Sequence, residues 1–428
     1  MEIFNKIESN VRSYSRSFPR VFSKAKGDLI YHDDFAYLDF LAGAGSLNYG
    51  HNHPILKGEL IKYIENNGIT HGLDMQTKAK GEFLEIFNEK ILSARNMEYV
   101  VQFTGPTGTN AVEAAFKIAR NVTGNVNIIA FTNGFHGVSL GSLAATANSY
   151  HRNAAGIPLQ GIFRMPFDGY LGKDVNTAYY IDKLLSDSSS GINSPAALVV
   201  ETIQGEGGVN TASFSWLRQI QEICLKHNII FIVDDIQSGC GRTGSFFSFE
   251  EAGIYPDIVT LSKSLSGYGI PFSLVLMKPH LDKWKPGEHN GTFRGNNHAF
   301  ITAKAAIEHF WSDNDFVITI NDKGKYIKER LKKIIDKSQN SLFSLRGRGM
   351  FLGLNCSNGK LAKSISKKAF DNGLIIETSG ANDEVLKFLC PLTISNDNLK
   401  KGMDIIEESI NDVLVNYETR LDKNAVLI

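Results

Sequence analysis

The chain has few cysteines, no excess of charge of either sign and no long apolar run. Its 428 residues include only four cysteines, which lie far apart and lack the paired spacing of a metal site. This pattern excludes a disulfide framework and favours a reducing compartment. Because 45 lysines and arginines balance 45 aspartates and glutamates, no global field attracts nucleic acid or an anionic membrane, and any anion needs a local site.

Targeting signals are also missing. The first 18 residues carry charges throughout and lack the apolar core of a signal peptide, and no apolar segment is long enough to cross a bilayer. His51 and His53 lie in a Gly- and Asn-rich loop before Pro54, with no third ligand in sight. We therefore expect a cytoplasmic protein without a metal, and with small molecules rather than nucleic acid or membranes as partners.

Alternation of strand-like and helical segments predicts an α/β fold. From Pro54 to about Ala305 the alternation favours a mostly parallel sheet flanked by helices, followed by an α+β unit that packs with the N-terminal segment as a small domain. We predict boundaries at 1–50 for the N-terminal part of the small domain, 51–305 for the large domain and 306–428 for its C-terminal part. The strand candidates are 100–103, 126–131, 197–201, 229–233, 258–261 and 272–277, and helix candidates include 110–120, 214–226 and 321–337.

Two chemical groups follow neighbouring strand candidates in the predicted sheet. The apolar run 229–233 ends in Asp234 and Asp235, and the run 257–261 leads to Lys263. Open α/β sheets bind ligands at this edge. A carboxylate for a pyridinium nitrogen and an amine for an imine are what a protein supplies to pyridoxal 5′-phosphate (PLP). We assign the ring contact to Asp234, and a helix cap or a supporting role to Asp235.

Other loops supply candidate contacts for such a cofactor. The turn that contains Gly108 and Thr109 joins a strand to a helix and exposes backbone N–H groups to an anion. Phe135 and His136 follow the strand 126–131, where an aromatic ring can stack on a flat cofactor; core packing is the alternative for Phe135. Thr292 lies in a Gly- and Asn-rich loop from which its hydroxyl can reach a phosphate.

Taken together, these segments resemble the class III (ω-amino acid) aminotransferases, PLP enzymes of fold type I. The resemblance spans essentially the whole chain and is carried by GHNHP (50–54), TGTNAVEAAFKIAR (107–120), GFHGVSLGSLAAT (134–146), ETIQGEGG (201–208), DDIQSGCGRTG (234–244), LSKS (261–264) and GTFRGN (291–296). It implies a large domain with a mostly parallel, seven-stranded type of sheet and a smaller α+β domain.

The resemblance also implies roles for individual residues. Lys263 is the imine-forming lysine and proton carrier, Asp234 pairs with the pyridine nitrogen, and Gln237 bonds near the ring hydroxyl. Phe135 stacks on the ring, and Gly108 and Thr109 hold the phosphate. Thr292 reaches the phosphate of a neighbouring subunit, which implies a homodimer or higher oligomer with shared active sites.

For the substrate the resemblance implies a different pair of residues. Glu201 stands at the position of a gate glutamate, which in several members pairs with an arginine near the C-terminus. That arginine is replaced here by Lys387. Because lysine offers a point charge where arginine offers a planar fork, the mode of carboxylate binding is left open.

Within the family, the opening third is most similar to L-2,4-diaminobutyrate:2-oxoglutarate 4-aminotransferases of the ectoine pathway. The matching segments include VRSYSRSFPRVFSKAKG (11–27), GITHGLDM (68–75) and KSLSGYGIP (263–271). This implies reversible amino transfer that converts L-2,4-diaminobutyrate and 2-oxoglutarate to L-aspartate 4-semialdehyde and L-glutamate. Ornithine, a diamine, 4-aminobutyrate or β-alanine as donor are the alternatives within the same fold, and PLP-dependent racemisation or aminomutase chemistry is a further one.

Overall fold

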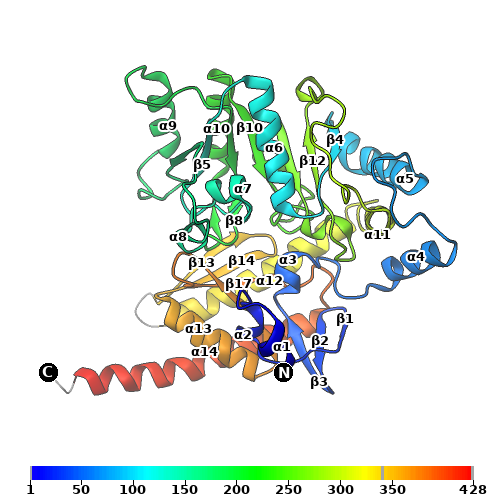
Figure 1. The fold of residues 1–428 in the computed structure, drawn as a ribbon. Coiled ribbons are helices and arrows are strands. Elements are labelled where there is room, and N and C mark those ends of the chain that lie inside the picture. Colours follow the sequence, from blue (N-terminus) through cyan, green and yellow to red (C-terminus); the bar gives the residue numbers. More distant parts are fainter. Residues whose placement is uncertain (1, 339–341, 426–428) are drawn as a thin grey trace.

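A seven-stranded sheet forms the centre of the upper lobe in the computed structural model, which describes residues 2–338 and 342–425 (Figure 1). The strand order is β4-β12-β11-β10-β7-β5-β6, and only β12 runs antiparallel to its neighbours. The bounds are β4 Val100–Phe103, β5 Ile128–Phe131, β6 Ile162–Met165, β7 Ala197–Val200, β10 Ile230–Asp234, β11 Ile258–Leu261 and β12 Leu274–Met277. The predicted mostly parallel sheet is confirmed.

Helices cover both faces of this sheet, which explains why its central strands are apolar along most of their length. Ile230 and Ile232 of β10 pack into the core on the side of α6 (Gly108–Thr123). Phe231 and Val233 of the same strand pack on the opposite side, with α10 (Phe214–Lys226). The other helical segments of this lobe are α4 Pro54–Glu65, α5 Lys78–Ile86, η1 Phe87–Leu92, η2 Ser93–Arg95, α7 Leu140–Ala145, α8 Ser149–Asn153, α9 Thr177–Ser186, η3 Glu250–Ala252, η4 Lys263–Ser266, η5 Pro279–Leu281 and α11 Asn297–Phe310.

The sequence pattern missed one strand of the sheet, β6. It lies at the edge of the strand order, its sequence is IFRM, and only Met165 is fully buried. A half-buried edge strand that contains an arginine lacks the continuous apolar run by which the other strands were predicted.

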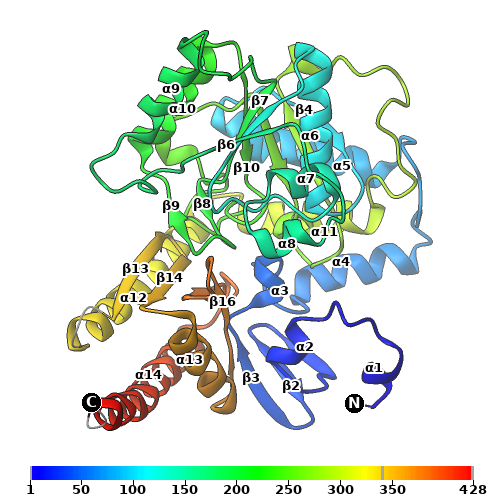
Figure 2. The same cartoon turned by 60° about the vertical axis from the view of Figure 1, so that its left-hand side comes forward.

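The lower lobe is built from both the N-terminal and the C-terminal parts of the chain (Figure 2). The N-terminal strands β2 (Leu29–His32) and β3 (Phe35–Asp39) form a hairpin, and β3 pairs in parallel with β15 (Leu374–Ile375) from the C-terminal part. A second, antiparallel sheet has the order β13-β14-β17-β16. The domain boundaries at 50 and 305 stay predictions.

The remaining elements of the lower lobe include the long helix predicted at 321–337, which begins earlier, at Asp315. None of the helices within the described ranges is both long and apolar enough to span a bilayer. The remaining bounds are α1 Glu2–Ile7, α2 Tyr14–Ser17, β1 Lys24–Lys26, α3 Ala42–Gly45, β8 Ile203–Gln204, β9 Asn210–Thr211, α12 Asp315–Lys337, β13 Phe343–Arg348, β14 Phe351–Cys356, α13 Gly359–Asp371, β16 Glu377–Ser379, β17 Val385–Phe388 and α14 Asn396–Ala425.

Candidate active site

The acid and the amine predicted at neighbouring strand ends lie on paired strands. Asp234 is the last residue of β10 and stands opposite Thr260 of β11 in the parallel register. The Thr260 hydroxyl donates a hydrogen bond of 3.0 Å to Asp234 Oδ1. Lys263 follows three residues after Thr260, at the start of η4. Both groups therefore lie at the carboxyl edge of the parallel strands, where open α/β sheets bind ligands.

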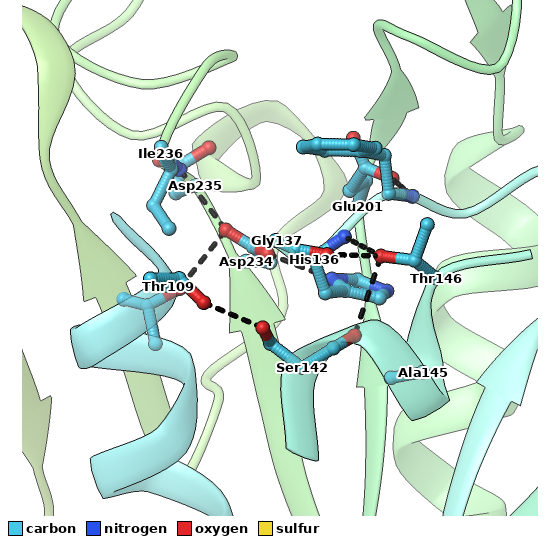
Figure 3. Close-up of polar contacts among 12 residues, drawn as sticks. Thr109, His136, Gly137, Ser142, Ala145, Thr146, Glu201, Asp234, Asp235 and Ile236 are labelled. Carbon is cyan, nitrogen blue, oxygen red and sulfur yellow. Dashed lines mark hydrogen bonds and ion pairs between the residues drawn. The ribbon is translucent and has the colours of Figure 1, made fainter. Parts of the chain in front are cut away.

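The carboxylate of Asp234 is buried and held by a histidine (Figure 3). His136 Nδ1 lies 2.7 Å from Asp234 Oδ2, and the two side chains are almost fully buried. The backbone N–H of His136 donates to Thr146 Oγ1 at 3.0 Å, which fixes the loop that carries the ring. His136 therefore fixes the orientation of the Asp234 carboxylate, a role that the sequence did not specify.

Lys263 has an unusual backbone and a perturbed amine. Its φ of 49° lies in the left-handed region, which is uncommon outside glycine and concentrates at functional sites. Burial lowers the pKa of its amine, and Lys387 acts in the same direction, whereas Glu206, Glu377 and Glu201 oppose them. Because an imine forms from a neutral amine, burial of this kind suits an imine-forming lysine.

The N-terminus of α6 presents Gly108 and Thr109 as predicted. Its first turn leaves backbone N–H groups without intrahelical partners, and the N-cap Thr107 makes no capping side-chain bond. The Thr109 hydroxyl lies 2.6 Å from Ser139 Oγ and 2.5 Å from Ser142 Oγ. Glycine at 137 permits this cluster, because a Cβ there would lie 2.5 Å from Thr109 Oγ1. The two serines were missed from sequence, although both lie in the GFHGVSLGSLAAT segment.

Glu201 supports the loop that carries Phe135. Its carboxylate accepts the backbone N–H of Phe135 at 2.8 Å and that of Gly205 at 3.4 Å. Burial raises the pKa of Glu201 to about 7, with the Asp234 charge acting in the same direction and His136 against it. The Phe135 side chain is half-buried, and its ring meets His151 edge-on with centroids 5.6 Å apart.

The sequence left the partner of Lys387 open, and the structure pairs it with glutamates other than Glu201. Lys387 Nζ pairs instead with Glu206 Oε1 at 2.7 Å and with Glu377 Oε1 at 3.1 Å. Glu206 lies in the same ETIQGEGG segment as Glu201, in the turn between β8 and β9, and the sequence analysis did not single it out. The β8–β9 turn carries the second glutamate to Lys387, while the first remains bonded to the Phe135 loop.

Three further predicted residues have distinct environments. Asp235 accepts hydrogen bonds from Ser238 Oγ at 2.8 Å and from Ser248 N at 3.0 Å, and burial raises its pKa to about 6, which agrees with a supporting role. Gln237 donates to Ala44 O at 3.1 Å and to Glu206 Oε1 at 3.2 Å. Thr292 is exposed on the segment between η5 and α11, and its role toward a second subunit stays a prediction.

Comparison with known proteins identifies the family. The class III aminotransferase family model matches residues 11–410. The chain belongs to the class III aminotransferases. Diaminobutyrate--2-oxoglutarate transaminases from Bordetella parapertussis and Halomonas elongata are 55% and 54% identical to it, over 97% and 95% of this chain and 96% and 98% of theirs. An ornithine aminotransferase structure from Toxoplasma gondii superposes with a TM-score of 0.85 at 26% identity, covering 97% of this chain and 95% of that one.

This membership confirms the predicted fold class and PLP as the cofactor. The residues present fit that group: open N–H groups at α6 suit a phosphate, the buried Asp234 carboxylate suits a protonated ring nitrogen, and Lys263 offers the amine. The three come from different elements that converge on one edge of the sheet.

Proposed function

We propose that this class III aminotransferase is a diaminobutyrate--2-oxoglutarate transaminase. It moves the 4-amino group of L-2,4-diaminobutyrate to 2-oxoglutarate, which yields L-aspartate 4-semialdehyde and L-glutamate, and the reaction is reversible. The observation that carries this assignment is the 52–55% identity to several transaminases of that name over nearly the full length of both partners. We also propose that the enzyme, working in the reverse direction, supplies diaminobutyrate for ectoine synthesis.

In this proposal the chain's residues handle protons and charge around the cofactor. Bound PLP supplies an aldehyde that forms an imine with amines and a ring that withdraws electrons from the substrate carbon. With PLP bound, the amine of Lys263 would be freed when the substrate amine takes its place, and it would then take the proton from the substrate carbon and deliver it to the aldehyde-derived carbon of the cofactor. The buried Asp234, fixed by His136, holds the ring nitrogen protonated.

The other predicted residues position the cofactor and substrate. Gly108 and Thr109 would hold the phosphate at the α6 N-terminus, and the Phe135 ring would stack on the cofactor from the loop that Glu201 supports. Gln237 bonds near the ring hydroxyl. Lys387 binds a substrate carboxylate through its single charged amine. To do so, this ammonium group must replace an ion pair with a protein carboxylate by one with the substrate carboxylate.

We also propose a cytoplasmic homodimer in which Thr292 reaches the phosphate of the partner subunit. Exposed apolar side chains support an interface here: Leu73, Met75 and Phe293 line a surface hollow of about 350 Å³ together with Gly295. Apolar patches of this kind mark association surfaces. Light scattering should give twice the chain mass, and Thr292→Ala should weaken cofactor retention without changing that mass.

The decisive experiment is a panel of amine donors with 2-oxoglutarate and added PLP, with the products identified by mass. We expect L-2,4-diaminobutyrate to give the highest kcat/KM and one glutamate per donor consumed. Because the two substrates take turns on one cofactor, the kinetics should be ping-pong. Preferential turnover of ornithine, 4-aminobutyrate or β-alanine would replace the assignment, and turnover without an acceptor would indicate racemase or aminomutase chemistry.

A further inference from the structure

Lys387, a buried lysine of the lower lobe, forms ion pairs with two carboxylates, although one would be enough to balance its charge. Lys387 of β17 stands directly opposite Glu377 of β16 in the antiparallel register, with Nζ 3.1 Å from Glu377 Oε1. Glu206 approaches the same ammonium at 2.7 Å from the β8–β9 turn. Lys387 is fully buried and Glu377 nearly so. The cluster of Lys387, Glu377 and Glu206 therefore contains one more carboxylate than ammonium group.

Glu206 is the better-paired of the two acids. Its Oε1 also accepts a hydrogen bond from Gln237, and Lys387 and then Lys263 lower its pKa although burial opposes them. The pKa of Glu377 is raised instead, because burial and the charge of Glu206 outweigh the opposing effects of Lys387 and Lys263. A buried carboxylate without a full counter-charge is costly, so its retention here needs a reason.

Glu377 is nevertheless held in place by a distant part of the chain. The hydroxyl of Tyr14, from the N-terminal α2, donates to Glu377 Oε2 at 3.2 Å. The other oxygen, Oε1, faces Lys387 without a well-aligned hydrogen bond. One oxygen is thus anchored, and the other can accept from a further donor.

The cluster also lies within electrostatic reach of the imine-forming lysine. Lys387, Glu206 and Glu377 all act on the pKa of Lys263. Gln237 joins the cluster to Ala44 and to the loop that follows Asp234. These interactions place charged groups close to Lys263, within reach of the far end of a substrate whose reacting amine meets the cofactor there.

We propose that Glu377 binds the second, non-reacting ammonium group of a diamino acid, while Lys387 binds the carboxylate on the same carbon. This inference rests on the proposed function and names the residue that selects its donor. L-2,4-Diaminobutyrate carries such an ammonium on the carbon next to its carboxylate, and 4-aminobutyrate is the same molecule without it. The ammonium of such a donor offsets the carboxylate that the donor itself brings, so the cluster keeps a surplus of one carboxylate, whereas a donor without it raises the surplus to two and leaves Glu377 without a partner of its own.

The test compares these two donors in the holoenzyme and in Glu377→Gln. Loss of a charge-assisted hydrogen bond predicts a roughly 10- to 100-fold fall in kcat/KM for L-2,4-diaminobutyrate, mostly through KM. The kcat/KM of Glu377→Gln for 4-aminobutyrate should stay within about threefold of the wild-type value. If turnover of this donor is slow, the change of the cofactor absorbance in a single turnover gives the rate. Equal falls for both donors, or no fall for either, would overturn the inference.

Two further variants separate recognition from folding. Tyr14→Phe leaves the Glu377–Lys387 pair in place and removes only the anchoring hydroxyl, so it should reduce the preference for diaminobutyrate by a smaller factor, roughly threefold. Glu384→Gln is the matched control, because Glu384 precedes β17 but its carboxylate caps the Asn382 N–H outside the cluster. An altered donor ratio in Glu384→Gln, or an unaltered one in Tyr14→Phe, would contradict the inference.

The wild-type enzyme separates this inference from the assignment beneath it. If wild type does not turn over L-2,4-diaminobutyrate, the proposed function fails, and the selection role fails with it. If wild type prefers diaminobutyrate and Glu377→Gln keeps that preference, only the role of Glu377 is wrong.

Discussion

Two carboxylate sites flank the candidate cofactor position, and they are built in opposite ways. Asp234 ends a buried strand of the large sheet and has fixed partners in His136 and Thr260. The Lys387 cluster is assembled from the β16–β17 strand pair, the β8–β9 turn and the N-terminal α2. The first site has one carboxylate with three donors, His136, Thr260 and the backbone N–H of Ile236, whereas the second has two carboxylates sharing one ammonium.

The difference corresponds to what each site binds. A cofactor stays in one place through every turnover, so a rigid acid at a strand end serves it. At the Lys387 cluster, two substrates with different charges bind in turn. Groups that can exchange ion-pair partners suit such a site. Rigid support at the first site and surplus charge at the second predict different responses to mutation.

The largest effect is expected for the amine itself. Lys263→Ala removes both the imine bond and the proton carrier, so kcat should fall by about 10⁴-fold, the upper end of what a positioned acid–base group contributes. The fold should persist, which circular dichroism and an unchanged oligomer mass would show. Turnover close to that of the wild type would refute the assignment of this residue.

The next effect concerns the rigid acid. Asp234→Asn removes the buried charge but keeps the side-chain shape, so the rate should fall roughly 100-fold and PLP should bind more weakly, since loss of one partner of a buried pair costs about 3 kcal/mol. The cofactor dissociation constant, measured by dialysis, reports this change. Asp235→Asn is the adjacent control: its carboxylate bonds Ser238 and Ser248, so cofactor affinity should be unchanged.

A smaller effect is expected in the pH dependence of stability. Because the pKa of Glu201 is raised to about 7 in the fold from an ordinary 4.5, its contribution to stability is full below about pH 4.5 and is lost as the pH rises through 7. The free energy of unfolding should therefore fall by up to about 3 kcal/mol across this window. Glu201→Gln still accepts the Phe135 N–H and should flatten that slope in urea titrations at pH 5 and pH 8; an unchanged slope would show that Glu201 does not titrate there.

The smallest effect tests the packing beneath the phosphate site. Gly137→Ala adds a Cβ 2.5 Å from Thr109 Oγ1, at a φ of 127°, so it should cost about 1–3 kcal/mol of stability and weaken PLP binding. Gly124→Ala has the backbone strain without the clash, because nothing lies within 4 Å of its Cβ position. If both variants lose the same stability and keep the same cofactor affinity, the Gly137 contact with Thr109 has no part in cofactor binding.

Much of the Asp234 site was predictable because its information is local. A β-branched run that ends in Asp234, and a second that leads to Lys263, place both groups at one sheet edge once the strands are parallel. The turn before α6 is equally local. His136 was included as a cofactor residue, but its bond to Asp234 spans 98 residues and has no counterpart in the spacing of either motif.

The sequence by itself determined the mostly parallel sheet, the amine and acid at neighbouring strand ends and the family, because apolar runs and strand-end residues carry that information over a few positions. Tertiary structure alone decided which glutamate meets Lys387. Glu206, Glu377 and Tyr14 lie 181, 10 and 373 positions from it, and only the pairing of β16 with β17, the β8–β9 turn and the docking of the N-terminal segment bring them together. A salt bridge depends on distance in space, and local patterns contain no information about which distant charges the fold will make neighbours.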